Sequence, residues 1–255
     1  MTALTEGFLR LPLAHRGLHD VADGRPENSR AAIRAAIKAG YGIEIDLQLS
    51  RDGRAMVFHD YDLLRLTGQK GPIQRRSAAE LGQIALLGGS DTVPTLTQVL
   101  DQVAEQVPLL IEIKDQDGQM GANIGKLEEA TARALQGYEG PVALMSFNPH
   151  SVQKMAGLCP DIPRGLTTSA YRAEDWQLLP NGTRDRLREI PDYDALGCCF
   201  ISHEADDLDR PRVAELKRRG ANVLCWTIRS PEAEAEARKI AQNVTFEGYL
   251  AENPA

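Results

Sequence analysis

Short apolar runs alternate with longer amphipathic segments along nearly the whole chain. Runs rich in leucine or β-branched residues predict strands, and apolar positions at helical spacing predict helices between most of them. The expected strands are 8–14, 42–49, 108–113, 141–146, 163–168, 197–202, 221–227 and 244–250. The expected helices are 28–39, 95–106, 122–136, 149–158, 182–190, 209–219 and 231–241, the first of them capped by Asn28.

This alternation indicates an α/β fold with parallel strand pairing. Eight such units in a chain of 255 residues fit a (β/α)₈ barrel, or TIM barrel, which is typically about this long. A doubly wound open sheet is the alternative fold. No Gly-x-Gly-x-x-Gly pattern follows the first strand, so the usual dinucleotide-binding reason for that fold is missing. We therefore expect one barrel domain over residues 1–255.

One segment departs from the alternation of strands and helices. Asp52 and Gly53 lie between two alternating runs, which is a strong β-hairpin signal. With a two-residue loop, Asp46 would stand directly opposite His59 across the hairpin. Residues 60–94 then show glycines and polar turns without a clear helix pattern. We expect this segment to be a small insertion after the second strand.

The overall charge limits the range of partners. The chain has 29 basic and 36 acidic residues, for a net charge of -7. This balance argues against nucleic acid or an anionic membrane as the main partner. No apolar run approaches membrane-spanning length, and the N-terminus lacks a basic head followed by an apolar core. The four cysteines have no metal-ligand spacing and are typical of buried thiols, so we expect a cytoplasmic protein without stable membrane insertion.

Charged residues interrupt two of the predicted core strands. Glu44 and Asp46 fall on one face of the second strand, and Glu112 shares a face with Lys114 in the third. Ionised groups inside a barrel cost several kcal/mol each unless they are paired or bind a metal. A salt bridge with Lys114 is the simplest explanation, but three carboxylates outnumber one lysine. We therefore expect a divalent cation, and an all-oxygen ligand set favours Mg²⁺ or Ca²⁺ over zinc.

Two histidines lie at the ends of apolar runs beside other polar residues. His15 is followed by Arg16, and His59 follows the predicted hairpin. Histidine titrates near neutral pH, so two of them can divide general-acid and general-base work. An arginine recognises a phosphate with two planar donors. Together with the cation and Lys114, these residues predict a site that binds a phosphate and moves protons around it.

The ordered set of short motifs resembles the signature of the glycerophosphodiester phosphodiesterase family. The motifs are "HRG" at 15–17, "PENS" at 26–29, "EIDLQLSRDG" at 44–53, "VFHD" at 57–60, "IEIK" at 111–114, "SFN" at 146–148, "CWTI" at 225–228 and "EGYLAENP" at 247–254. The resemblance implies a (β/α)₈ barrel with a small insertion after the second strand. It also implies metal-dependent hydrolysis of glycerophosphodiesters, which yields sn-glycerol 3-phosphate and an alcohol.

The resemblance further implies roles for nine residues. The metal ligands become Glu44, Asp46 and Glu112, and the catalytic residues become His15 and His59. The substrate-binding residues become Arg16 and Lys114 at the phosphate, Trp226 as a wall, and Glu27 at the border of the site. The end of the chain departs from the family pattern of Asp-Gly followed by Thr-Asp, because Glu247, Ala251 and Glu252 stand there instead.

Two other functions compete with this one. A phospholipase D-like or lyase activity on lysophospholipids would need a long apolar groove or an amphipathic membrane-facing element, and the sequence shows neither. A catalytically silent barrel that only binds phosphorylated ligands would lack a histidine or a carboxylate, and none is missing. The leaving alcohol, the choice between Mg²⁺ and Ca²⁺, the nucleophile, the division of roles between the histidines and the oligomeric state stay open.

Overall fold

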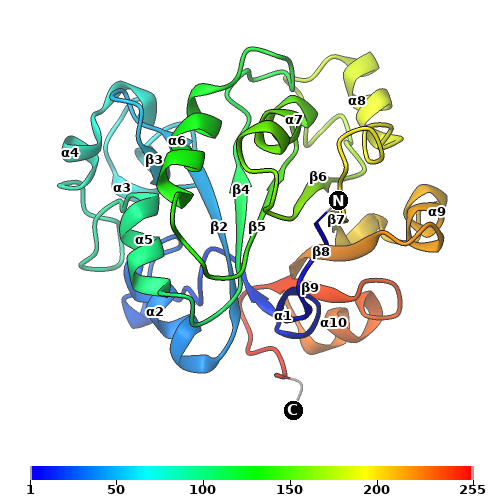
Figure 1. Ribbon diagram of the computed structural model, residues 1–255. Helices are drawn as coiled ribbons and strands as arrows, with labels where there is room; N and C mark the ends of the chain where they lie inside the picture. Colours follow the sequence, from blue (N-terminus) through cyan, green and yellow to red (C-terminus); the bar gives the residue numbers. More distant parts are fainter. Residues whose placement is uncertain (1, 254–255) are drawn as a thin grey trace.

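A computed structural model describes residues 2–253 (Figure 1), so Pro254 of the predicted C-terminal motif lies outside the described residues. Parallel strands pair in the order β1-β9-β8-β7-β6-β5-β4-β2, and β1 pairs with β2 to close a barrel. The predicted TIM barrel is thus confirmed. Its strands are β1 (Leu13–Ala14), β2 (Gly42–Leu49), β4 (Leu109–Ile113), β5 (Val142–Ser146), β6 (Arg164–Thr168), β7 (Phe200–Glu204), β8 (Asn222–Ile228) and β9 (Asn243–Phe246).

Helices follow the strands and surround the barrel (Figure 1). The sequence predicted each of them, the helix 149–158 with the bounds observed and the others with one or both ends that differ by a few residues. The first of these is α2 (Arg30–Ala39). Ser29 caps its start with a side chain that accepts a hydrogen bond from the Ala32 amide, and Gly40 caps its end in the left-handed region. The other helices are α5 (Leu96–Val103), α6 (Lys126–Leu135), α7 (Pro149–Leu158), α8 (Asn181–Arg188), α9 (Pro211–Arg218) and α10 (Pro231–Ala237).

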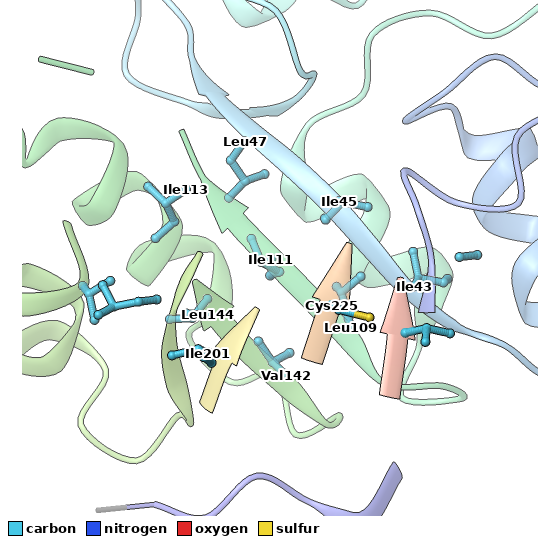
Figure 2. Packing of buried hydrophobic residues seen from close by; sticks show 14 of the residues in the cluster. Ile43, Ile45, Leu47, Leu109, Ile111, Ile113, Val142, Leu144, Ile201 and Cys225 are labelled. Atoms are coloured by element: carbon cyan, nitrogen blue, oxygen red, sulfur yellow. The ribbon is translucent and has the colours of Figure 1, made fainter. Parts of the chain in front are cut away.

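The main hydrophobic core lies between the strands and these helices. Ile43, Ile45 and Leu47 alternate along β2 and pack with residues of β4 and its neighbours in this cluster (Figure 2). Because successive side chains of a strand point to opposite faces, Glu44 and Asp46 point to the barrel interior. The side chains on the outer face of each strand therefore pack against the helices, and those on the inner face point into the barrel interior.

A second apolar cluster fills the amino-terminal end of the barrel. The predicted strand 8–14 is wrong over most of its length, because Glu6–Arg10 forms helix α1 and only the last two residues pair as β1. Phe8 of α1 is fully buried and packs in one cluster with Leu110 and Phe200. Strand alternation therefore gives way here to a helix that closes the end of the barrel.

An extra strand, β3 (Ala55–Val57), pairs antiparallel with β2. The predicted hairpin is confirmed, but its register is wrong by one residue. Leu47 stands opposite Val57, and the Phe58 amide donates to the Asp46 carbonyl at 2.9 Å, so His59 is not directly opposite Asp46. The reason is a loop of three residues, 51–53, closed by the bond from the Ser50 amide to the Arg54 carbonyl.

The predicted insertion follows β3 and has more helix than expected. It contains α3 (Leu64–Thr67), α4 (Ala78–Leu81) and a 3₁₀ turn, η2 (Ile73–Arg75). The remaining 3₁₀ turns are η1 (Val21–Asp23) and η3 (Ala205–Asp207). The insertion has a small apolar cluster of its own, formed by Met56, Phe58, Leu63, Leu66, Ile73, Leu81, Ile84, Leu86 and Val93. This cluster holds the insertion in place without a long helix.

The cysteines agree with a further expectation. Cys198, Cys199 and Cys225 are buried, Cys159 is partly buried, and all four are free thiols. Between residues 2 and 253, each helix is too short or too polar to cross a lipid bilayer.

Candidate active site

Three carboxylates meet in the barrel interior near the carboxyl ends of β2 and β4. Asp46 stands opposite Glu112 in the parallel register, and Glu44 precedes Asp46 by two residues on the same face. The side chains of all three are buried, and one oxygen from each lies within 4.8 Å of the others. Active sites of TIM barrels lie at this end of the strands. The structure therefore brings together the three residues that the sequence predicts as metal ligands.

Lys114 balances only part of the negative charge in this cluster. Its Nζ lies 2.8 Å from Asp46 Oδ1 and 2.8 Å from Glu112 Oε1. Burial raises the pKa of Asp46, but the nearby charges of Lys114 and other cations outweigh it and hold that pKa well below its usual range. Glu44 has the opposite shift, because burial and its repulsion by Asp46 and Glu112 raise its pKa well above the ordinary value. The predicted salt bridge exists, and among residues 2–253 Glu44 has no cationic side chain as close as Lys114 is to Asp46 and Glu112.

The donor set suits a hard divalent cation. All three groups offer carboxylate oxygens, which Mg²⁺ and Ca²⁺ prefer. A divalent charge would remove the repulsion that raises the pKa of Glu44. The cluster therefore fits a metal ion better than a purely internal salt bridge.

Arg16 reaches the cluster from the tight loop after β1. Its φ is 55°, and the φ of Gly17 is 77°, so both residues adopt the left-handed region. Glycine is needed at position 17, because an added Cβ would lie 2.9 Å from the Ala32 backbone. This close approach turns the arginine inward, where its Nε lies 3.2 Å from Asp46 Oδ2 and its Nη1 donates to Glu27 at 2.8 Å.

Glu27 and Asn28 orient the charged groups around them. Glu27 lies between Arg16 and Arg65, and Arg65 of the insertion donates to both of its oxygens at 2.8 Å. The sequence reasoning missed Arg65. Asn28 is not the helix cap that we predicted, since its side-chain amide donates to Asp46 Oδ2 at 2.9 Å and Ser29 caps the helix. Asn28 thus helps to orient a predicted metal ligand.

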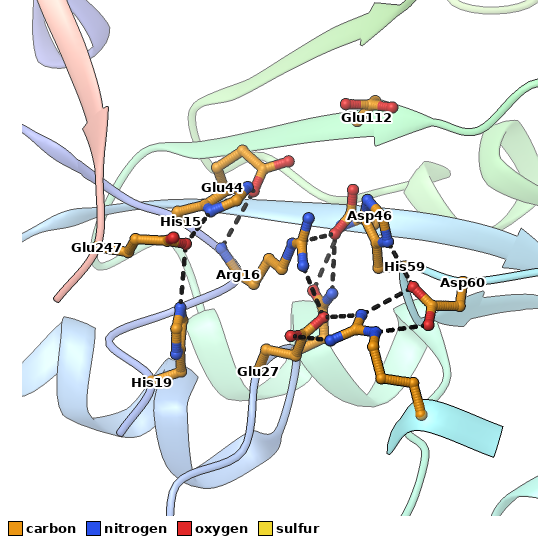
Figure 3. A network of polar contacts seen from close by, with 12 residues as sticks. His15, Arg16, His19, Glu27, Glu44, Asp46, His59, Asp60, Glu112 and Glu247 are labelled. Carbon is orange, nitrogen blue, oxygen red and sulfur yellow. Dashed lines mark hydrogen bonds and ion pairs between the residues drawn. The ribbon is translucent and has the colours of Figure 1, made fainter. Parts of the chain in front are cut away.

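His15 is held by an acid from the other end of the chain. Its Nδ1 lies 2.5 Å from Glu247 Oε2, and its Nε2 lies 3.9 Å from Glu44 (Figure 3). Glu247 also lies 3.4 Å from His19 Nε2 and accepts a hydrogen bond from Arg229 at 2.8 Å. Burial lowers the pKa of His15, and the hydrogen bond from His15 lowers the pKa of Glu247. A carboxylate acceptor places the imidazole hydrogen on Nδ1, so Nε2 is free toward the acids.

Glu247 is a contact that the sequence reasoning missed. In the sequence, Glu247 stands out only as a departure from the family pattern. The available signal was a carboxylate inside the predicted strand 244–250; in the structure it follows β9 by one residue, at the end of the barrel where the other polar residues gather. Its partner lies 232 positions away in the sequence, so only closure of the barrel brings the two side chains together.

His59 has a matching partner in Asp60. Its Nδ1 lies 2.7 Å from Asp60 Oδ1, and Asp60 in turn accepts a hydrogen bond from Arg65 Nε at 2.7 Å (Figure 3). Hydrogen bonding from His59 and Arg65 outweighs the effect of burial and lowers the pKa of Asp60. Both predicted catalytic histidines are therefore fixed through Nδ1 by a carboxylate. The His59 side chain is 32% exposed and the His15 side chain 12%, so His59 is the more open to solvent.

One cavity of about 470 Å³ joins these groups. Its polar side contains both histidines, the three acids, Arg16 and Lys114. Trp226 stands on the opposite, apolar side, where its ring lies 5.6 Å from that of Phe147 and its Nε1 donates to the Ser202 carbonyl. The other large side chains of this side are Met120, Met145 and Trp176. The cavity can therefore hold a small ligand with one charged part and one less polar part.

Two polar residues at the carboxyl ends of β5 and β7, Ser146 and His203, do not line this cavity. His203 is fully buried, and its ring nitrogens bond to the Thr168 hydroxyl at 2.8 Å and to Asp207. Ser146 is buried as well, and its hydroxyl donates to the Ile113 carbonyl at 2.6 Å. Both side chains use their polar atoms inside the fold and are structural.

A TIM barrel with an acidic cluster, two carboxylate-held histidines and buried cations at its carboxyl end defines a barrel enzyme that acts on a phosphate ester. The chain belongs to the glycerophosphoryl diester phosphodiesterase family, whose model matches residues 15–247. Family membership confirms the prediction of a phosphoric diester hydrolase.

Individual relatives cover most of the chain. YhdW of Bacillus subtilis is 27% identical over 235 residues, which are 88% of each chain. The glycerophosphodiester phosphodiesterase of Caldanaerobacter subterraneus is 28% identical over 177 residues, which are 66% of this chain and 70% of that one. Among solved structures, an Oleispira antarctica phosphodiesterase in complex with the product sn-glycerol 3-phosphate is 26% identical, covers 93% of both chains and has a TM-score of 0.75.

Proposed function

We propose that this protein hydrolyses glycerophosphodiesters to sn-glycerol 3-phosphate and an alcohol with the help of one divalent cation, Mg²⁺ or Ca²⁺. The observation that carries the proposal is the buried trio of Glu44, Asp46 and Glu112 in one cavity with two carboxylate-held histidines. The product bound to the Oleispira antarctica phosphodiesterase supports this choice of substrate. We also propose a cytoplasmic location, because four free thiols are typical of a reducing compartment.

The phosphate would bind at the charged side of the cavity. A cation held by the three carboxylates would act as a Lewis acid toward the phosphate oxygens. Arg16 and Lys114 already lie at this side, and each is held in place by Asp46. Positive groups fixed in advance stabilise the extra negative charge of the transition state without reorganising. The two side chains would therefore serve as phosphate contacts, as the sequence predicts.

The histidines would move the protons. With Nδ1–H directed to Glu247 in one case and Asp60 in the other, each imidazole presents Nε2 to the cavity. One would take the proton from the nucleophile while the other gives a proton to the departing alcohol. Both a water molecule and the neighbouring glycerol hydroxyl are competent nucleophiles for this arrangement, the second by way of a cyclic phosphate.

The remaining predicted residues would shape the site around the substrate. Trp226 would form the wall against the glycerol or the leaving alcohol, from its place in the apolar side of the cavity. Glu27 would act through Arg16 and Arg65, because it accepts hydrogen bonds from both. Its pKa lies below the ordinary value, since the hydrogen bonds and charges of these arginines outweigh its burial.

A cation-restoration experiment tests this proposal. Metal-stripped protein is assayed on a panel of glycerophosphodiesters, and Mg²⁺ and Ca²⁺ are restored one at a time. We expect hydrolysis to disappear on chelation and to return with at least one cation. Full hydrolysis by the stripped protein would overturn the metal requirement. Binding of the diesters without turnover under every condition would favour the catalytically silent barrel instead.

A further inference from the structure

A second cluster of possible metal ligands lies beside the three carboxylates and differs from them in its donor atoms. It consists of His15, His19 and Glu247, and one donor atom from each residue lies within 4.8 Å of the others. Figure 3 shows the two imidazole rings on opposite sides of the Glu247 carboxylate, each joined to it by a dashed line. The proposed function uses His15 for proton transfer but gives no role to His19. His19 is thus a potential ligand that the proposed chemistry leaves unused.

The backbone places all three side chains at one point of the barrel rim. The His19 amide donates to the Gly17 carbonyl at 2.9 Å, so the loop after β1 turns back and brings His19 beside His15. The Glu247 amide donates to the Ile228 carbonyl at 2.9 Å, directly after β9. The exposed fractions of the side chains are 12% for His15, 23% for His19 and 19% for Glu247. The donor atoms are therefore held in place and are open enough for a small hydrated ion to reach them.

The donor set of this cluster suits zinc. Two imidazole nitrogens and one carboxylate oxygen favour Zn²⁺ over Mg²⁺ and Ca²⁺, and three protein ligands leave the fourth position for water. Bonds of about 2.0–2.2 Å to a tetrahedral zinc ion put the ligand atoms about 3.3–3.6 Å apart. Glu247 Oε2 lies 3.4 Å from His19 Nε2 and 2.5 Å from His15 Nδ1. The first distance already fits, and the second would lengthen as the ion replaces the hydrogen between the two atoms.

Arg229 orients the carboxylate for this role. Its Nε donates to Glu247 Oε1 at 2.8 Å, whereas both histidine contacts go to Oε2. Hydrogen-bonded partners behind a metal ligand commonly fix its orientation in this way. The Arg229 side chain is exposed, so solvent and salt screen its positive charge and it opposes the binding of a cation only weakly. Oε2 is therefore the oxygen that is directed to the two imidazoles.

We propose that His15, His19 and Glu247 form a zinc site whose occupation inhibits the enzyme. The proposal rests on the proposed function, because it takes His15 as one of the two proton-transfer groups. A zinc ion on Nδ1 leaves the hydrogen of the neutral ring on Nε2, the nitrogen that faces Glu44. The ring then has no lone pair with which to accept a proton, and it is too weak an acid to give one. Zinc would therefore block His15 as acid and as base, while Mg²⁺ or Ca²⁺ stays at the carboxylates.

Zinc binding is measured first, independently of activity. The full-length protein is dialysed against Zn²⁺ with saturating Mg²⁺ or Ca²⁺ present, and the bound zinc is determined by elemental analysis. We expect the affinity to fall by at least about 100-fold in His19→Gln, since even groups behind a metal ligand contribute about 10- to 100-fold. Glutamine can still donate to Glu247 but is a poor zinc ligand. His150→Gln, at an exposed histidine of α7, is the matched control and should bind zinc as the unmodified protein does.

Inhibition is measured next, on glycerophosphocholine with the cation that supports turnover. Saturating zinc should lower the kcat of the unmodified protein and of His150→Gln by about 10²- to 10⁴-fold, as loss of the His15 imidazole would. Without zinc, His19→Gln should keep its kcat within about twofold, and it should need at least about 100-fold more zinc for the same inhibition. An excess of Mg²⁺ or Ca²⁺ should not restore the rate, because these ions prefer oxygen ligands.

The outcomes separate this proposal from the one on which it rests. Hydrolysis that is insensitive to zinc, or equal zinc affinity in His19→Gln and the unmodified protein, overturns only the zinc proposal. Inhibition that excess Mg²⁺ or Ca²⁺ relieves would locate the zinc at the three carboxylates and would overturn it as well. A chain that binds zinc through His19 but hydrolyses no glycerophosphodiester with any cation would contradict the proposed function, and the inhibitory role of the site would fall with it.

Discussion

The two ends of the barrel interior are built from the same strands in opposite ways. At the amino-terminal end, Leu110 of β4 packs with Phe8 and Phe200 in a wholly apolar cluster. Two residues further along the same strand and on the same face, Glu112 joins the cluster of buried carboxylates. A step of two residues along one strand thus changes the interior from a packed core to a charged site.

Close packing is visible at the amino-terminal end even in its glycines. A Cβ at Gly42 would lie 2.6 Å from a methyl of Leu13, and one at Gly165 would lie 2.5 Å from the ring of Phe200. Large side chains fill this narrow interior only because glycines stand opposite them. At the carboxyl end, by contrast, charges of like sign are packed together and burial raises the pKa of Glu44. The comparison indicates that the amino-terminal region stabilises the fold. The carboxyl-terminal region destabilises it by bringing like charges together, and these charges are the ones that function requires.

The largest expected effect comes from the histidines of the charged end. His15→Ala and His59→Ala should each lower kcat by about 10²- to 10⁴-fold, because each removes a proton-transfer group. The thermal midpoint should change little, since neither ring belongs to an apolar cluster of the described residues. Steady-state kinetics and thermal melts of the same preparations measure both quantities. Rates near those of the unmodified protein in both variants would show that the proton-transfer assignment is wrong.

At the amino-terminal end of the barrel we expect a loss of stability without a loss of activity. Phe8→Ala should lower the free energy of unfolding by about 3–5 kcal/mol, because it leaves a cavity beneath the strands. The kcat of the protein that remains folded should not change. Denaturant unfolding with parallel assays at low temperature would measure this. A large loss of kcat in fully folded Phe8→Ala would contradict the division of the interior into two regions.

A smaller effect is expected at Glu247, which acts through His15. Glu247→Gln should lower kcat by about 10- to 100-fold with little change in KM, because a neutral amide replaces the charged carboxylate acceptor that fixes the orientation of the imidazole. Glu247→Asp keeps the carboxylate and should recover part of the rate. Arg229→Gln is the control, since the exposed Arg229 also bonds Glu247 but does not touch His15. Equal losses of kcat in all three variants would indicate a general disturbance of the loop.

Strand alternation explains why much of the fold could be predicted from the sequence. Buried strands such as β2 and β4 carry their pattern locally, and that pattern also places Glu44 and Asp46 on one face. The helix α1 was missed because five residues before a strand carry too few apolar positions to separate helix from strand. The hairpin register was missed because the alternating pattern of the two strands is the same for a two-residue and a three-residue loop. The extra loop residue nevertheless shifts every cross-strand pair by one position.

The sequence predicted only those site residues that interrupt an apolar strand pattern or belong to a short motif. Glu247 and Arg65 were missed because their importance lies in contacts that closure of the barrel and docking of the insertion create. Contacts between distant loops are a property of the assembled barrel and leave little trace in the local sequence.

A crystal structure of the protein grown with Ca²⁺ tests the central claim most directly. The account predicts one ion that is coordinated by oxygens of Glu44, Asp46 and Glu112 at about 2.3–2.6 Å. An ion bound elsewhere, or the three carboxylates compensated by Lys114 alone at saturating Ca²⁺, would contradict it.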